Sequence, residues 1–129
     1  MDRASAQATR VLVVEDDRAV MSMLTEVLVR SGYEVVPARN GVAAMVALTA
    51  PEPECPNLVL LDLGLPLESG VSVLSFLRNI MRSGLPVVVL TGHSDAQEEA
   101  AVRELGVSEY LHKPASPQQL LAALSRALL

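Results

Sequence analysis

Three uninterrupted apolar segments constrain the fold of this chain more than any other feature. They cover residues 11–14, 58–61 and 87–90, and polar residues or proline adjoin them. Short runs rich in β-branched residues are typical of strands that are buried on both faces of a sheet. Residues 33–37 and 107–111 are weaker strand candidates. Strands of this kind need helices on both faces of the sheet to cover them.

Segments with apolar residues at helical spacing alternate with the expected strands. The first three are a stripe from Val20 to Leu28 ending at Ser31-Gly32, a short helix over 42–48, and a stripe of Leu74, Leu77 and Met81 ending at Ser83-Gly84. This alternation favours a parallel sheet over an antiparallel one.

Capping signals mark the start of the last two helices. Ser94 is the expected N-cap of the fourth helix, with Gln97 as its capping-box partner. Ser116 is the expected N-cap of the fifth, with Pro117 at the first helical position and Gln119 as partner. Strand and helix thus alternate five times, which predicts an α/β fold: a five-stranded parallel sheet, doubly wound, with right-handed crossovers.

Length and composition narrow the class of protein. The 129 residues suit one domain, and we expect residues 1–9 to be a flexible leader before a domain over 10–129. The net charge is −5 and the basic residues are scattered, so direct nucleic-acid binding is not expected. The apolar runs are too short for a membrane span, and the N-terminus lacks an apolar signal core. We therefore expect a cytoplasmic protein.

Polar residues follow the apolar strands at the points where the strands end. Glu15 and Asp16 follow the first strand, Asp62 the third, Thr91 the fourth and Lys113 the fifth. In open parallel sheets, ligands bind outside the carboxyl ends of the strands. We therefore expect these five side chains to lie at one edge of the sheet.

These residue types indicate phosphoryl transfer. Clustered carboxylates repel one another unless a cation binds between them, and oxygen ligands without His or Cys favour Mg²⁺. A carboxylate can attack phosphorus and form an aspartyl phosphate, while a hydroxyl and an ammonium hold the phosphoryl oxygens. Asp17, by contrast, is expected only to favour the positive N-terminus of the first helix.

Four segments together resemble the receiver domain of two-component response regulators. They are residues 13–17, residues 60–66 with Gly70, residues 90–92 and residues 110–114. The resemblance runs from about Val11 to the C-terminus and implies the flavodoxin-like strand order 2-1-3-4-5. It also implies a switch that accepts a phosphoryl group and catalyses its own phosphorylation and dephosphorylation.

The resemblance implies a role for each residue of the site. Asp62 would be the phosphoacceptor, Asp16 would bind Mg²⁺ directly, and Glu15 would bind it through water. The backbone carbonyl of Gly64 would complete the protein ligands of the metal. Thr91, together with Lys113, would contact the phosphoryl group.

Two further features carry over from the family. Tyr110 would be the aromatic residue whose rotamer follows activation together with Thr91, and the Lys113–Pro114 peptide bond would be cis. Gly64 stands where relatives often carry a larger residue, which could shorten the phosphorylated lifetime. Ala115 stands where many DNA-binding relatives carry Phe, which puts their mode of dimerisation in doubt for this chain.

The implied partners are a histidine kinase or histidine phosphotransfer domain on one side and an output domain or partner protein on the other. The output would use the face made by the fourth helix, fifth strand and fifth helix, in a monomer or weak dimer.

Three alternatives remain open. A pseudo-receiver that serves only as a docking module would not need the complete acidic set. A phosphohydrolase with an Asp nucleophile would carry a second Asp where Gly64 stands. A flavin-binding electron carrier would have a hydroxyl- and Gly-rich loop after the first strand, where this chain has acids.

Overall fold

The computed structural model describes residues 8–92 and 95–129. Within them, five parallel strands form one sheet in the order β2-β1-β3-β4-β5. The strands are β1 (Arg10–Val14), β2 (Glu34–Ala38), β3 (Leu58–Leu61), β4 (Val87–Thr91) and β5 (Glu109–His112). The predicted fold class and strand order are confirmed. Most of the expected leader, residues 1–7, lies outside the described residues.

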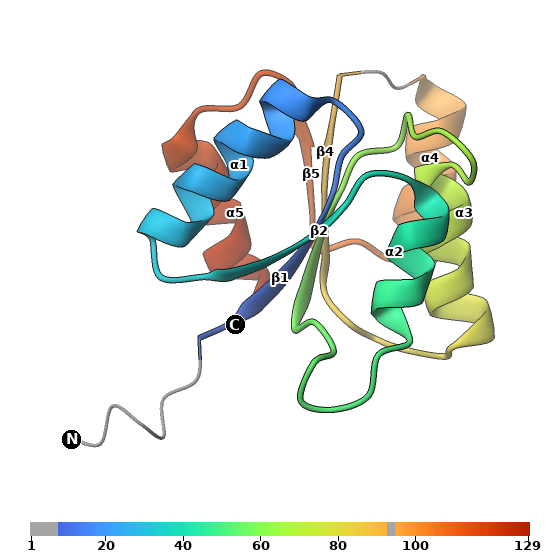
Figure 1. Ribbon diagram of the computed structural model, residues 1–129. Coiled ribbons are helices and arrows are strands. Elements are labelled where there is room, and N and C mark those ends of the chain that lie inside the picture. The colour runs from blue at the N-terminus through green and yellow to red at the C-terminus, as the bar shows by residue number, and fades with distance from the viewer. Residues whose placement is uncertain (1–7, 93–94) are drawn as a thin grey trace.

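Helices cover both faces of the sheet, as Figure 1 shows. On one face lie α1 (Arg18–Arg30) and α5 (Pro117–Ala127); on the other lie α2 (Gly41–Leu48), α3 (Gly70–Ser75) and α4 (Ala96–Leu105). Side chains alternate along each strand, so Val11 and Val13 pack under α1 and α5 while Leu12 and Val14 pack under α2 and α3. The described residues therefore form two apolar cores, one on each face of the sheet.

The C-terminal end of α1 and the N-terminal end of α5 lie where the sequence predicts them. The helix α1 is followed by Ser31 as C-cap and by Gly32 with φ +94°, a conformation that favours glycine. Ser116 and Gln119 form the predicted capping box of α5, with Pro117 in its first turn.

The start of α4 differs from the prediction. Its N-cap is Asp95, whose Oδ1 accepts a hydrogen bond from the backbone N–H of Glu98 at 2.7 Å. The expected cap, Ser94, lies outside the described residues. Ser and Asp have the same capping chemistry, and Glu98 stands three residues after Asp95 as Gln97 does after Ser94. The predicted cap is Ser94 alone, and the structure places the cap one residue later, at Asp95.

The third helix also ends differently from the prediction. A π-helical segment, η2 (Phe76–Ile80), follows α3 directly, and the N–H of Met81 donates to the carbonyl of Phe76 at 3.0 Å. The helical run stops before Arg82, which has φ +56°, and does not continue to Ser83-Gly84. The predicted apolar stripe is nevertheless buried at Leu74 and Leu77.

Parallel pairing sets the position of the candidate site. Because all five strands run the same way, the residues that follow β1, β3 and β5 reach one edge of the sheet together with the end of β4.

Among the described residues, no helix combines the length and apolar character that crossing a membrane requires.

Candidate functional site

Three carboxylates meet at the carboxyl edge of the sheet. Glu15 and Asp16 follow β1, Asp62 follows β3, and one oxygen from each lies within 4.8 Å of the others. Glu15 is only 2% exposed and Asp62 8%, whereas Asp16 is exposed to solvent. The predicted acidic residues are thus brought together, and buried negative charge of this kind is costly without a counter-charge.

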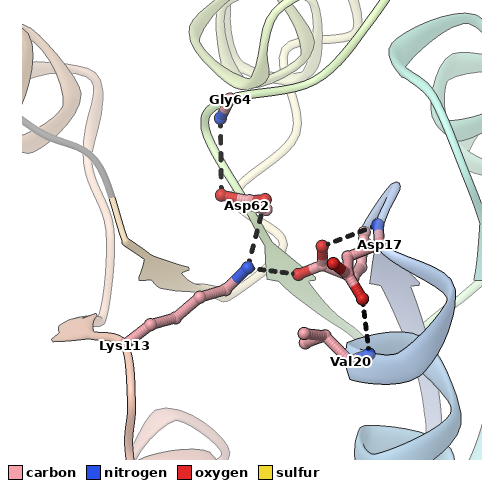
Figure 2. Close-up of polar contacts among 6 residues, drawn as sticks. Asp17, Val20, Asp62, Gly64 and Lys113 are labelled. Atoms are coloured by element: carbon pink, nitrogen blue, oxygen red, sulfur yellow. Dashed lines mark hydrogen bonds and ion pairs between the residues drawn. The ribbon is translucent and has the colours of Figure 1, made fainter.

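Lys113 supplies part of that counter-charge. Its Nζ lies 2.6 Å from Oε1 of Glu15 and 3.3 Å from Oδ2 of Asp62, and so bridges the two buried acids (Figure 2). Burial lowers the pKa of Lys113, but the hydrogen bond to Glu15 and the charges of Asp62 and Glu15 together outweigh burial. The net effect raises the pKa of Lys113 above its ordinary value of 10.5.

The raised pKa makes Lys113 a source of stability over a defined pH range. Because the folded state holds the proton more tightly than the unfolded state, the contribution is complete below pH 10.5 and is lost as pH rises through the folded-state pKa. Lys113 is the only lysine, so isotope-labelled lysine gives one side-chain NMR signal to titrate. We expect a pKa above 10.5 in the wild type and a lower one in Glu15→Gln. A value that this substitution leaves unchanged would contradict the assigned cause.

Asp17 positions both the site and the first helix. Its backbone N–H donates to Oε2 of Glu15 at 3.0 Å, and its side chain accepts from the N–H of Val20 at 3.0 Å as the N-cap of α1 (Figure 2). The side chain of Asp17 is therefore part of the helix terminus, as the sequence indicated. Its backbone fixes the orientation of the buried Glu15 carboxylate.

The loop after β3 holds Asp62 from the other side. The N–H of Gly64 points to Oδ1 of Asp62 at 3.4 Å (Figure 2). A Cβ built on Gly64 would have no atom within 4 Å, so the space that a larger residue would fill is open here. Gly70 is the opposite case, because a Cβ there would lie 2.4 Å from the carbonyl oxygen of Asp62.

Thr91 and Lys113 are linked through the backbone at the ends of β4 and β5. Thr91 is fully buried, and its carbonyl accepts from the N–H of Lys113 at 2.9 Å. The Lys113–Pro114 peptide bond is cis, as expected.

Tyr110 lies on β5 and faces α4. The residue is half-buried, and its hydroxyl is buried without a hydrogen-bond partner among the described residues. The guanidinium of Arg103 lies 5.2 Å from the ring centroid, and Glu99 holds that guanidinium at 2.9 Å. Sequence reasoning missed Arg103. The only signal for it was the Glu99–Arg103 spacing on α4, which also occurs in ordinary surface ion pairs.

Comparison with known proteins shows the family to which the chain belongs. The sequence matches the family model of the response regulator receiver domain over residues 11–125. The chain belongs to this family. Receiver domains are the phosphoacceptor modules of two-component systems, and the carboxylates and Lys113 described above lie at the carboxyl edge of this receiver domain.

Curated relatives of this receiver domain are response regulators. The DNA-binding response regulator MtrA of Mycobacterium tuberculosis (strain ATCC 25618 / H37Rv) is 39% identical over 119 residues, which cover 92% of this chain and 50% of MtrA. The phosphate regulon transcriptional regulatory protein PhoB of Escherichia coli (strain K12) is 34% identical over 122 residues, 94% of this chain and 52% of PhoB. The receiver domain thus spans about half the length of these relatives.

Solved structures of similar proteins share the receiver fold. A CheY-like receiver domain protein from Methanospirillum hungatei JF-1 has a TM-score of 0.86 at 28% identity and covers 95% of this chain and 94% of that one. The receiver domain of a signal transduction histidine kinase from Syntrophus aciditrophicus has a TM-score of 0.81 at 28% identity, with 94% and 90% covered.

Proposed function

We propose that Asp62 is the phosphoacceptor of this receiver domain and that a histidine kinase or histidine phosphotransfer domain is its donor. The observation that carries the proposal is the buried Asp62 carboxylate, with an ammonium at 3.3 Å and two further acids beside it. A nucleophilic carboxylate, a cation for the phosphoryl oxygens and oxygen ligands for a metal are the parts that phosphoryl transfer requires.

The residues of the acidic cluster fit a hard divalent cation. Glu15, Asp16 and Asp62 offer only carboxylate oxygens, and their net negative charge exceeds what Lys113 neutralises. We propose that Asp16 and Asp62 hold Mg²⁺ with the Gly64 carbonyl, while Glu15 contacts it through water. Bound there, Mg²⁺ would supply charge neutralisation for the oxygens of the phosphoryl group.

In the proposed reaction, Asp62 is the nucleophile, and Lys113 and Thr91 stabilise the charge of the phosphoryl group and hold it in position. An oxygen of Asp62 forms a bond to phosphorus as the nitrogen–phosphorus bond of the donor histidine breaks, and the electron pair of that bond stays on the imidazole nitrogen. Lys113, now paired with Glu15 and Asp62, would follow the new negative charge onto the phosphoryl oxygens. The hydroxyl of Thr91 is the proposed second donor to these oxygens.

Acetyl phosphate tests the proposal without a named kinase. With Mg²⁺ it should add one phosphoryl group to the intact protein, detected by mass spectrometry as a hydroxylamine-sensitive adduct. A wild-type protein that stays unlabelled under these conditions would contradict the phosphoacceptor function and would favour the pseudo-receiver reading.

Mg²⁺ should raise the melting temperature of the wild type. A cation that binds only the folded protein stabilises it, and here it also relieves repulsion among the three carboxylates. Asp16→Asn should weaken Mg²⁺ affinity by about tenfold or more, the loss of about 1.4 kcal/mol or more of binding free energy. Calorimetric titration measures this affinity, with Glu26→Gln on α1 as a matched control. Equal Mg²⁺ affinity in wild type and Asp16→Asn would remove Asp16 from the ligand set.

The output is proposed to use the face of α4, β5 and α5. Tyr110 lies on this face under Arg103, and a change in its rotamer would alter the packing between α4 and β5. We propose that a partner protein or an output domain binds this face. We also propose that the receiver domain spans residues 10–129. One of the relatives named above, MtrA, is a DNA-binding response regulator, so an attached nucleic-acid-binding domain is compatible with this proposal.

A further inference from the structure

Arg78 connects three segments that are distant in the sequence. It lies in the π-helical segment η2, and its Nε lies 3.2 Å from the carbonyl oxygens of both Leu105 and Gly106. Its Nη2 donates to Gly106 at 2.8 Å and its Nη1 to the carbonyl of Ser83 at 2.8 Å. One guanidinium thus holds the end of the third helix against the corner between α4 and β5.

The partners of Arg78 are backbone carbonyls. Burial lowers the pKa of Arg78, and within residues 8–92 and 95–129 no carboxylate forms an ion pair with it. Leu105 is the last residue of α4 and Gly106 is its C-cap, so these carbonyls form the negative end of the helix dipole. Arg78 therefore meets the C-terminal end of α4 with a complementary positive charge.

The two ends of α4 are tied to different parts of the molecule. Its C-terminal end is bound to η2 through Arg78, and Gly106 adopts φ +98° at the corner that leads to β5. Its N-terminal end begins with Asp95, four residues after Thr91, at the edge of the sheet that carries the phosphorylation site. Of the two ends of α4, the N-terminal end is therefore the nearer to Thr91 along the chain.

We propose that Arg78 is a positioning residue that anchors the C-terminal end of α4, so that α4 responds to phosphorylation by pivoting about this end. The proposal rests on the proposed function for the signal that starts the movement. A helix of ten residues is about 15 Å long, so a rotation of about 10° about the anchored end displaces its other end by about 2.6 Å. The output face would then change most at the start of α4.

The anchor can be tested first without phosphorylation, by amide hydrogen exchange. The N–H of Gly106 donates to Val102 and Arg103 in the last turn of α4, and the N–H of Ser108 donates to Val87. In Arg78→Met these two amides should exchange at least about tenfold faster, because hydrogen bonds to a charged group are lost. Arg30→Met, which removes only an exposed ion pair to Glu26, should leave both rates unchanged.

The Arg78 variant is expected to remain folded. An open hollow of about 550 Å³ lies beside Arg78 and Gly106, so water can reach the carbonyls that the substitution frees. Arg78→Lys gives a second comparison, because one ammonium can replace only part of the planar fork. Its exchange rates should fall between those of the wild type and Arg78→Met.

The pivot is tested by adding beryllofluoride and Mg²⁺, a mimic of the phosphorylated state. In the wild type, exchange should change at the amides of Glu98 and Glu99, which bond to Asp95, while Gly106 and Ser108 keep their rates. In Arg78→Met the change should spread to Gly106 and Ser108. If Arg78 only stabilised the fold, Arg78→Met would not change which end of α4 alters its exchange rates when beryllofluoride binds.

Each arm can overturn the proposal separately. Unchanged exchange at Gly106 and Ser108 in the unmodified Arg78→Met protein would show that Arg78 is not an anchor. Equal beryllofluoride responses at both ends of wild-type α4, or the wild-type pattern in Arg78→Met, would exclude the pivot. Failure of acetyl phosphate to label the wild type would instead remove the phosphoacceptor function and with it the pivot, while the exchange rates of the unmodified protein would still decide the anchor.

Discussion

Asp62→Asn is expected to abolish phosphoryl labelling by acetyl phosphate and Mg²⁺. The substitution keeps the shape of the side chain but replaces the carboxylate, the proposed nucleophile, with an amide, which is a far weaker nucleophile. It also removes one of the two negative charges that hold Lys113 in the site. Intact-protein mass spectrometry should therefore show one added phosphoryl group on the wild type and none on the variant.

Asp17→Asn is the matched control for this experiment. Asp17 is a neighbouring acid, but its side chain caps α1 and asparagine is an equally good N-cap. This variant should fold with wild-type stability and label to the same extent. Stoichiometric labelling of Asp62→Asn at another acyl phosphate would show that the phosphoacceptor is a different residue.

Gly70→Ala is expected to destabilise the fold and impair labelling together. A Cβ at this position would lie 2.4 Å from the carbonyl oxygen of Asp62 and 2.6 Å from Cα of Leu63, and both are backbone atoms that cannot rotate away. The loop after β3 must shift, which should lower the free energy of unfolding by about 3 kcal/mol, at the upper end of the usual cost of overpacking. The same shift displaces the Asp62 carboxylate from Lys113.

Gly84→Ala is the corresponding control, because a Cβ at Gly84 would meet no atom within 4 Å. Urea denaturation should give an unchanged or slightly higher stability for this variant, since alanine restricts the unfolded chain. A Gly70→Ala protein with the stability and labelling rate of the wild type would show that the loop after β3 adjusts freely. The packing of Gly70 on Asp62 would then have no part in positioning the proposed phosphoacceptor.

The sequence by itself determined the strands and the residues at their ends. Buried parallel strands must be apolar on both faces, so residues 11–14, 58–61 and 87–90 could be recognised without any tertiary information. Because parallel strands end at one edge, the acids after β1 and β3 and the lysine after β5 could be placed together. The capping box at Ser116 was equally local, since both of its hydrogen bonds lie within four residues.

Only the tertiary structure decided how charge is distributed in the site. Glu15 and Asp16 are adjacent acids in the sequence, yet Glu15 is 2% exposed and Asp16 is open to solvent. The bridge from Lys113 to Glu15 joins residues 98 positions apart, and its 2.6 Å length depends on the packing of four strands, from β1 to β5. No local pattern distinguishes a buried carboxylate from an exposed one beside it.

The end of the third helix was also decided by tertiary contacts. Apolar residues such as Leu74 and Leu77 face the core in either an α-helix or a π-turn, so periodicity did not reveal the segment Phe76–Ile80. Arg78 has no charged partner nearby in the sequence, and its role follows from carbonyls at Leu105 and Gly106. Backbone acceptors are present at every residue, so only the folded chain shows which of them a partly buried guanidinium reaches.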